Sequence, residues 1–323
     1  MTDVSVVIVT HNSAGYVGAC LDALGPACEG VTTEVLVIDT ASGDETLTRL
    51  ERRPGLEILA LGANEGFARA NNRGIRRARG ATVVLLNPDT VARPGSLAEL
   101  HRFLTAAPRR GAAGPRLVTG EGKLQPSAGG LPTLLTTFAH AAGLNRHLPS
   151  DEASRARLHA MLSLVMPRSS GRLGDHLAEP RRCEVVWAAA VALRAAALEE
   201  VGPLDEGLFM YGEENDLCAR LGRAGWEVWF DPRAEIVHFG GGSGAFAPPL
   251  AAQYYRSRRR FFRRHGGVAR RLAAPLAILG GLLMRPLVAL FAGRGAAAMR
   301  REARFSLATA AGLAAAGRRR PGP

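Results

Sequence analysis

Four clusters of small polar side chains follow apolar segments within the first ninety residues of the chain. The clearest lies in "LLNPDT", where the apolar run 83–86 stops at Asn87-Pro88-Asp89. Asn, Asp and Gly are common turn formers, so one such cluster is explained by a turn. The same oxygens also suit a divalent metal and a diphosphate. The clusters are Thr10-His11-Asn12, Asp39 with Asp44, Asn64, and Asn87-Pro88-Asp89.

The elements before these clusters alternate between strand and helix. Apolar strands are predicted at 4–9, 34–38, 56–61 and 82–86, and helices at 14–25, 44–53 and 66–79. This alternation indicates a parallel sheet with helices on both faces. Ligands of such sheets bind beyond the carboxyl ends of the strands. We therefore expect the four clusters to form one shared site rather than four unrelated turns.

Two common nucleotide-binding motifs are missing from the sequence. No GxGxxG follows the first strand, and no GxxxxGK[ST] occurs anywhere. Dinucleotide-dependent dehydrogenases and P-loop enzymes are therefore poor explanations of the sheet. We expect side chains, rather than a glycine-rich loop, to hold a nucleotide.

The pattern changes after the fourth strand. A helix is predicted over 91–113, and the pattern then weakens over 115–183, apart from a helix-like stretch at 133–144. The weak region is interpreted either as loops over the site, which select an acceptor, or as a disordered insertion. Further on we predict strands at 184–191, 227–230 and 234–244, and helices at 194–201 and 213–224.

Composition limits the alternatives. A chain of 323 residues with 47% hydrophobic residues is long enough for one large or two small domains. The four cysteines form no CxxC pair, so we expect neither a disulfide framework nor a structural zinc site, and a reducing compartment fits. The N-terminus "MTDVSVVIVT" has no basic region and its apolar run is too short for a signal peptide.

Taken in order, the motifs of this chain resemble those of family 2 glycosyltransferases of the GT-A fold, in particular the bacterial rhamnosyltransferase-like subgroup. The resemblance covers residues 4–244 with a gap near 115–183. The matching stretches are "VSVVIVTHNSAGYVGACLDAL", "VLVIDTASGDET", "NEGFARANNRGI", "VVLLNPDT", "LEEVGPLDEGLFMYGEENDLCARLGRAGWEV" and "IVHFGGGS".

The resemblance implies a nucleoside diphosphate sugar whose phosphates are bridged by Mg²⁺ or Mn²⁺. Asp89 is the expected carboxylate ligand of the metal. The family motif is often Asp-x-Asp, whereas this chain has Asn87 at the first position, which brings a dipole but no charge. His238 either completes the metal shell, contacts a phosphate or has a structural role.

The same resemblance implies contacts to the nucleotide from the first two strands and from the loop after the third. Asp39 is expected to meet the base or ribose, and Thr10 and Asn12 to line that pocket. Asp44 either contacts the base or caps a helix. Asn64 precedes a glycine that permits close backbone approach, whereas Asn71 and Gly74 are expected to be structural. Trp187 and Trp226 are candidates for stacking on a sugar, although core packing suits Trp226 better.

The stretch "GEENDL" carries the expected general base. Inversion at the anomeric carbon needs a base beside the acceptor hydroxyl, and the family usually has Glu-Asp-x-Asp here. The sequence Glu213-Glu214-Asn215-Asp216 makes Glu214 the expected base, with Glu213 and Asp216 as the other candidates. An acidic first turn also favours the helix dipole, which accounts for at least one of these acids.

The C-terminal part of the chain is strongly basic. Residues 251–323 contain sixteen arginines, no lysine and one acid, Glu302, so their net charge is +15. The whole chain has a net charge of +12, so residues 1–250 have a net charge of −3. Such asymmetry indicates an anionic partner, either a membrane surface or a nucleic acid. No nucleic-acid-binding module supports the second, so we expect no nucleic acid.

The tail also contains an apolar stretch at 272–293, about as long as the ~20 residues that a membrane span needs. Pro275, Gly280-Gly281, Arg285 and Pro286 interrupt it. A central arginine costs roughly 2.5–3.5 kcal/mol on insertion scales, so we expect helices that lie on the membrane rather than cross it. The alternative is a helical extension packed on the catalytic domain.

These observations predict an α/β protein of GT-A fold, with a Rossmann-like, mostly parallel sheet. Residues 1–250 would form the catalytic domain, in which 115–183 is a variable acceptor-side region, and 251–323 a basic, helical, membrane-associated extension. The expected function is inverting, metal-dependent transfer of a sugar, such as rhamnose from dTDP-rhamnose, to a lipid-linked or polysaccharide acceptor on the cytoplasmic face of the membrane. The alternatives are a catalytically degenerate nucleotide-sugar-binding scaffold and a sugar nucleotidylyltransferase.

Overall fold

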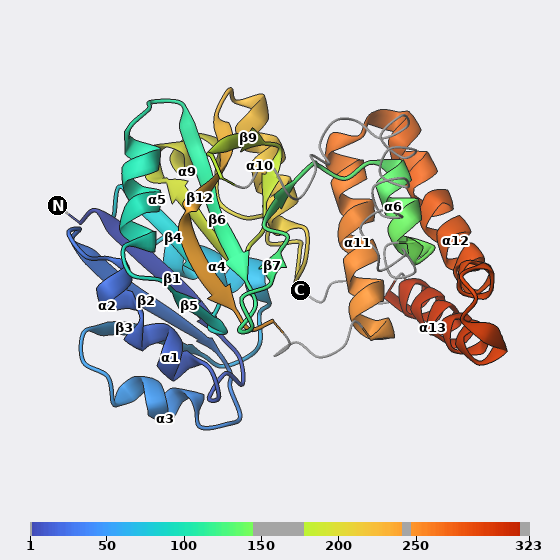
Figure 1. The fold of residues 1–323 in the computed structure, drawn as a ribbon, viewed down its shortest axis with the longest axis horizontal. Coiled ribbons are helices and arrows are strands. Elements are labelled where there is room, and N and C mark those ends of the chain that lie inside the picture. Colours follow the sequence, from blue (N-terminus) through green and yellow to red (C-terminus); the bar gives the residue numbers. More distant parts are fainter. Residues whose placement is uncertain (1, 145–177, 241–246, 317–323) are drawn as a thin grey trace. The chain divides into compact units, whose positions relative to one another are not determined.

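The computed structural model describes residues 2–144, 178–240 and 247–316 (Figure 1). The chain divides into two compact units. The first, which we call the sheet unit, comprises Met1–Leu131 and Gly171–Ser243. The second, the helical unit, comprises Pro132–Ser170 and Gly244–Pro323.

The sheet unit is built on one mixed, 10-stranded sheet. Its main path runs β3-β2-β1-β4-β11-β6-β12-β5, and β7 and β9 pair at the side with β6 and β12. The strands are β1 (Val4–Thr10), β2 (Thr33–Thr40), β3 (Leu56–Leu61), β4 (Thr82–Leu86), β5 (Thr90–Ala92), β6 (Arg110–Val118), β7 (Leu124–Gln125), β9 (Arg181–Cys183), β11 (Ala190–Arg194) and β12 (Glu227–His238). A separate pair is formed by β8 (Ala128–Gly129) and β10 (Val185–Val186).

The first four strands are parallel, as the alternating pattern predicted. β1 pairs in parallel with both β2 and β4, and β2 with β3. Thr10 lies opposite Asp39 in this register, and Ile8 lies opposite Leu86. The carboxyl ends of β1, β2 and β4 therefore meet at one edge, which brings three of the four polar clusters to the same place.

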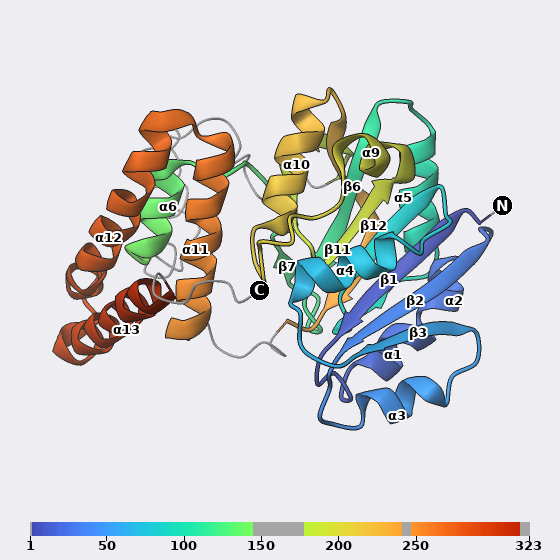
Figure 2. The same cartoon turned by 180° about the vertical axis from the view of Figure 1, so that it is seen from behind.

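Helices cover both faces of this sheet (Figures 1 and 2). One face packs on α1 (Val17–Asp22), α2 (Leu24–Ala27), α3 (Thr46–Glu51) and α5 (Ser96–Thr105). The other packs on α4 (Phe67–Ile75), α9 (Ala195–Val201) and α10 (Glu213–Arg223). Every residue of β4 is buried, because both faces of this strand are covered.

Several boundaries differ from the sequence prediction. The helix predicted over 91–113 is wrong at both ends, because α5 occupies only its middle, between β5 and β6. The single helix predicted over 14–25 is two short helices, α1 and α2. The two strands predicted at 227–230 and 234–244 are one strand, β12, which carries an irregularity between Asp231 and Glu235.

The helical unit contains α6 (Leu134–Ala141), α11 (Pro248–His265), α12 (Gly267–Phe291) and α13 (Gly295–Ala316). Its core includes Tyr255, Ile278 and Leu282. Gly281 lets α12 approach α6, because a Cβ atom at this position would lie 2.6 Å from the carbonyl oxygen of Phe138. The sequence assigned 133–144 to the acceptor-side region of the catalytic domain, whereas the structure groups α6 with the C-terminal helices.

The environment of Arg285 differs from the one assumed in the sequence analysis. The side chain is 4% exposed and is paired with Glu302 of α13. Its guanidinium also lies 4.2 Å from the ring centroid of Phe305. The helix α12 runs unbroken through Pro275 and Pro286. Arg285 therefore faces the interior of the helical unit and places no charge on the outer face of α12.

Candidate active site

Thr10 and Asp39 meet at the carboxyl ends of β1 and β2. The Thr10 hydroxyl donates a hydrogen bond to Asp39 Oδ1 at 2.8 Å, and the backbone N–H of Ser42 donates to Oδ2 at 2.9 Å. Both residues are fully buried. The Asp39 carboxylate is thus held rigidly at the end of its strand, with both oxygens already accepting hydrogen bonds from the protein.

The loops after β1 and β2 are fastened to each other. Asn12 Oδ1 accepts a hydrogen bond from the N–H of Gly43 at 2.8 Å, and Asp44 Oδ2 accepts one from Ala14 at 3.1 Å. Asp44 Oδ1 also accepts from the N–H of Thr46, at the start of α3. Burial raises the pKa of Asp44, but the hydrogen bonds from Thr46 and Ala14 outweigh it and hold the pKa below its usual value. Asp44 thus bonds the first residue of α3, although the N-cap position itself is Glu45 and has no side-chain cap.

Strained backbone marks these loops. Among the described residues, only Asn12, Ala41 and Tyr211 have positive φ without being glycine, at 51°, 55° and 67°. Two of them follow β1 and β2, and the third precedes the acids of α10. Such conformations cost free energy and concentrate at functional sites, so their positions agree with the sites predicted from the polar clusters.

Asn64 and Gly66 shape the loop after β3. Asn64 is exposed, and its Oδ1 accepts a hydrogen bond from the N–H of Gly66 at 3.0 Å. Gly66 has a φ of 85°, and a Cβ atom there would lie 2.6 Å from Phe209. The close backbone approach expected at this glycine therefore exists, but its partner is the loop before α10. No hydrogen bond joins Asn64 to the other predicted residues within the described part of the chain.

The "NPD" stretch forms a tight turn at the end of β4. The hydroxyl of Thr90 donates to the carbonyl oxygen of Asn87 at 2.7 Å, and the N–H of Asn87 donates to Ala189 at 2.9 Å. Asn87 Oδ1 is shielded from solvent and has no hydrogen-bond donor in the described structure. A buried acceptor without a donor is costly. A ligand hydroxyl or a bound water would remove this cost.

Asp89 and His238, the two predicted metal ligands, lie side by side. Asp89 Oδ1 is 3.5 Å from His238 Nε2. The backbone joins the same two strands, because the N–H of Phe239 donates to the carbonyl oxygen of Asp89 at 3.0 Å. Residues almost 150 positions apart are thus brought together by the antiparallel pairing of β5 with β12.

Gln125, which the sequence analysis did not select, fixes the ring of His238. Its Nε2 donates to the carbonyl oxygen of His238 at 2.8 Å, so its Oε1 faces His238 Nδ1, also at 2.8 Å. The ring therefore carries a hydrogen on Nδ1, and Nε2 is the nitrogen that faces Asp89. A fixed tautomer of this kind is typical of histidines that bind metals.

Asp89 and His238 fit a divalent metal that binds together with the substrate of the protein. No group of three or more His, Cys, Asp or Glu side chains suited to a metal occurs in the described ranges. At the end of β4, Asp89 and His238 together can supply two protein ligands. Mg²⁺ is commonly bound by one or two carboxylates and completes its shell with water and substrate phosphates, a pattern that Asp89 fits.

The three acids of α10 have different environments. Glu213 is 4% exposed, and its Oε2 has no hydrogen-bond partner within the described residues. It lines a small pocket together with Glu214, Phe67 of α4 and Leu85 of β4. Burial, with the nearby Glu214 carboxylate adding to it, raises the pKa of Glu213 well above its usual value. Glu213 therefore favours its neutral form.

Glu214 is half-buried and remains accessible, whereas Asp216 is occupied. Glu214 Oε2 accepts a hydrogen bond from the N–H of Gly212 at 3.2 Å, and Oε1 accepts from Asn215 at 2.9 Å. Asp216 is buried and pairs with Arg220 at 2.8 Å, one turn along α10. Of the three candidate bases, Asp216 has the clearest structural role.

The loop before α10, residues 202–212, is held from both sides. Arg220 donates to the carbonyl oxygens of Val201, Gly202 and Pro203. Asn72 of α4 bonds both backbone groups of Leu204, accepting from its N–H at 2.9 Å and donating to its carbonyl oxygen at 2.8 Å.

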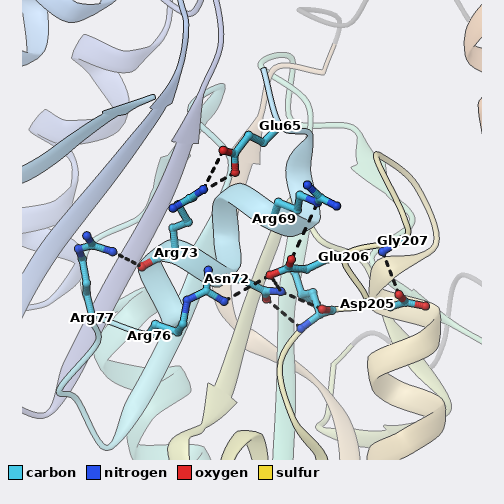
Figure 3. Close-up of polar contacts among 10 residues, drawn as sticks. Glu65, Arg69, Asn72, Arg73, Arg76, Arg77, Asp205, Glu206 and Gly207 are labelled. Atoms are coloured by element: carbon cyan, nitrogen blue, oxygen red, sulfur yellow. Dashed lines mark hydrogen bonds and ion pairs between the residues drawn. The ribbon is translucent and has the colours of Figure 1, made fainter. Parts of the chain in front are cut away.

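Charged contacts also attach this loop to α4, close to Asn72 (Figure 3). Glu206 accepts a hydrogen bond from Asn72 at 3.1 Å and pairs with Arg76 at 3.3 Å. Further along, the N–H of Phe67 donates to Phe209 at 2.7 Å. Asn72 lies within the motif "NEGFARANNRGI", but the sequence alone predicts no role for it. Its contacts show that it fixes the segment leading to Glu213 and Glu214.

The remaining predicted residues divide by exposure. Trp226 is 9% exposed, and its Nε1 donates to Glu200 at 2.9 Å, so it is a core residue as expected. Trp187 is 37% exposed and remains a candidate for stacking. Gly74 packs on β1, since a Cβ atom there would lie 2.3 Å from Val7. Asn71 donates a hydrogen bond to the carbonyl oxygen of Phe67 within α4. The contacts of Asn71 and of Gly74 are therefore structural ones. All four cysteines are free thiols.

Comparison with known proteins identifies the family. Residues 5–148 match the sequence profile of glycosyl transferase family 2. The chain is also 32% identical over 255 residues to an N-acetylglucosaminyl-diphospho-decaprenol L-rhamnosyltransferase of Mycobacterium tuberculosis, with 74% of this chain and 76% of that protein covered. The chain belongs to glycosyl transferase family 2. It is therefore a glycosyltransferase, and the nucleotidylyltransferase alternative is removed.

Solved structures agree on the fold of this glycosyltransferase. A mannosyltransferase from Pyrobaculum calidifontis, in complex with GDP-Man and Mn²⁺, aligns with a TM-score of 0.55 at 17% identity, covering 97% of this chain and 89% of that one. GalNAc-T7, with UDP, GalNAc and Mn²⁺, aligns with a TM-score of 0.51 at 16% identity and covers 80% of this chain. The alignment spans only 47% of GalNAc-T7. These similarities establish the GT-A type of sheet.

Proposed function

We propose that this glycosyltransferase is inverting and metal-dependent and transfers rhamnose from dTDP-rhamnose to a lipid-linked or polysaccharide acceptor. The geometry of Asp89 and His238 is the observation that carries the metal dependence, because Gln125 orients the imidazole as a ligand. The Mn²⁺ in the two structurally similar proteins supports a divalent metal. The rhamnosyltransferase from Mycobacterium tuberculosis supports rhamnose and a polyprenyl diphosphate acceptor.

In this proposal Asp89 and His238 hold the metal. When bound, the metal would neutralise the charge that the diphosphate gains as it leaves. Asn87 would offer its unpartnered Oδ1 to a ribose hydroxyl or to a bound water. Thr10, Asn12, Asp39, Asp44 and Asn64 would line the nucleotide pocket, the first four as a rigid platform.

Glu214 is the proposed general base. The acceptor hydroxyl oxygen would attack the anomeric carbon, the bond from that carbon to the diphosphate oxygen would break, and the hydroxyl proton would pass to Glu214. Attack opposite the leaving group inverts the anomeric configuration. Glu213 remains the alternative base, because its raised pKa lies nearer to the ideal range for proton transfer.

The proposed location is the inner face of the cell membrane. An acceptor carried on a polyprenyl lipid is fixed in a bilayer, and the basic tail suits anionic headgroups. One described helix, Gly267–Phe291, is long and apolar enough by length and composition to cross a membrane. We propose a peripheral protein that does not span the bilayer.

The second candidate function is a nucleotide-sugar-binding scaffold without turnover. Asn87 in place of an acid favours it, since the site then has one carboxylate fewer. The two functions are separated by incubating the protein with Mn²⁺, a panel of nucleotide sugars and a short-chain N-acetylglucosaminyl-diphospho-lipid. We expect transfer from dTDP-rhamnose, with the inverted anomer seen by proton NMR. Binding of nucleotide sugars without transfer or hydrolysis would favour the scaffold.

A further inference from the structure

The helix α12 carries a continuous apolar stripe on its exposed side. The stripe consists of Leu272, Leu276, Leu279, Leu283, Leu287 and Leu290, all of which are exposed. Successive helix residues are rotated by about 100°, so these six leucines fall within an arc of about 80°. Solvent-exposed leucines are common singly, but a row that follows a whole helix is not.

The opposite side of α12 is committed to the helical unit. Ala274, Ile278, Leu282, Arg285 and Ala289 are buried there. The helix packs on α6, α11 and α13, which lie beside it in both overall views (Figures 1 and 2). The helix therefore has one internal face and one exposed, apolar face.

Charge at the two ends of the stripe indicates the occupant. Arg270 and Arg271 are exposed at the beginning of α12, and Arg294 is exposed just beyond its end. The sole acid of residues 251–323, Glu302, is turned inward and paired with Arg285. Positive charge thus flanks both ends of the stripe, which suits anionic lipid headgroups and disfavours a second copy of the same surface.

The neighbours of α12 determine how it can meet a bilayer. A helix that crossed the membrane would take its packed partners with it. α11 packs on α12 and has exposed arginines at 259 and 263, which hydrocarbon would not accommodate. A helix lying in the plane of the membrane avoids this cost, since only its apolar side enters the lipid.

We propose that the leucine stripe of α12 is the membrane-inserting surface of this protein, lying in the plane of an anionic bilayer with the flanking arginines at the headgroups. The inference rests on the proposed membrane location and specifies the surface responsible. Attachment then depends on leucine burial as well as on charge, so it persists at salt concentrations that screen the arginines.

The test is flotation of the full-length protein with vesicles of phosphatidylglycerol and phosphatidylcholine, at low and high salt. Leu283→Gln removes a stripe leucine that is 77% exposed, and Leu307→Gln removes a leucine of α13 that is 72% exposed. Glutamine adds no charge and is a good helix former. We expect partitioning to fall about tenfold for Leu283→Gln and on the order of 100-fold for Leu276→Gln/Leu283→Gln, with Leu307→Gln unchanged.

Three results would overturn the proposal. Equal partitioning of the wild type and the double variant would exclude the stripe as the inserting surface. Membrane binding would then be explained by the arginines alone. A wild-type dimer that the double variant converts to a monomer, with flotation unchanged, would assign the stripe to a second copy of the chain. If the wild type does not bind vesicles, both the inserting surface and the membrane location are excluded. This result would not affect the proposed sugar transfer, which is measured separately with a soluble acceptor.

Discussion

At the scale of single residues, the site consists of side chains whose neighbours determine what they can do. Gln125 fixes the ring of His238 so that Nε2 faces Asp89. Arg220 occupies Asp216 and leaves Glu214 and Glu213 as candidate bases. Burial raises the pKa of Glu213 well above its usual value, so Glu213 favours its neutral form. Acids kept neutral by their surroundings are common at sites of acid–base chemistry.

The exchange Glu214→Gln separates the two candidate bases. It removes proton acceptance but keeps the shape of the side chain, so we expect the turnover number to fall by about 100-fold or more. Binding of the nucleotide should be unchanged in calorimetry. The matched variant Glu213→Gln keeps a neutral group where the wild type already favours one, and its turnover should change by less. The opposite ranking would make Glu213 the base.

The raised pKa of Glu213 also predicts how stability depends on pH. The folded protein holds the proton more tightly than the unfolded chain, whose value is near 4.5. The contribution of Glu213 is thus fully present below that pH and is lost as the pH rises through the folded-state pKa. Glu213→Gln cannot ionise, so its melting temperature should rise relative to that of the wild type as the pH increases above 4.5. A constant difference would place Glu213 in an ordinary solvated environment.

At the scale of elements, the loop before α10 depends on contacts from two helices. Asn72 reaches across 132 positions in sequence to bond both backbone groups of Leu204. Arg220 holds the three preceding carbonyl oxygens. Tyr211 and Gly212 then turn with positive φ into the acids. A fixed loop keeps the candidate base in a constant orientation, and such orientation contributes to the rate of an enzyme reaction.

Asn72→Ala tests the role of this loop. The change leaves the N–H and carbonyl groups of Leu204 without partners, at about 1–3 kcal/mol each. We expect the turnover number to fall about tenfold or more, with little change in nucleotide affinity. Asn71→Ala is the control, because Asn71 is equally buried but bonds only within α4. Equal losses in the two variants would indicate general destabilisation of α4.

The sequence predicted the elements that have a simple pattern. β3 and β4 have the predicted bounds, because they are short, mostly apolar runs. β6 was missed because it contains Gly111, Gly114 and Pro115, which disfavour a strand. The two glycines are there for packing, since Cβ atoms would lie 2.8 Å from Trp226 and 2.8 Å from Val186. Such a reason is visible only once the neighbours are known.

The candidate site shows the same limit. Asp89 and His238 could be selected because each follows a strand that the sequence predicts. Gln125 could not, because it lies in a two-residue strand within a glycine-rich stretch and acts only through His238. Asn72 lies in a motif, but its partner Leu204 is distant in sequence. Residues that position others are therefore the ones that sequence reasoning misses.

At the scale of the whole molecule, the candidate site and the proposed membrane surface lie in different units. The sheet unit has the candidate metal ligands Asp89 and His238, the strained loops and the acids, whereas the helical unit has the leucine stripe and the net excess of positive charge. Glu302 and Arg285 cancel each other inside the helical unit, so its outer charge is positive. This division suits an enzyme whose acceptor is anchored in lipid and whose donor is soluble.

The most direct test of the account is calorimetric binding of dTDP in the presence and absence of Mn²⁺, in the wild type and in Asp89→Asn. Asparagine keeps the size of the side chain but removes the charge that the metal needs. We predict metal-dependent binding in the wild type and a loss of affinity of about tenfold or more in Asp89→Asn, with an unchanged melting temperature. Binding of equal affinity with and without Mn²⁺, in both proteins, would contradict the assignment of Asp89 and His238 as a metal site.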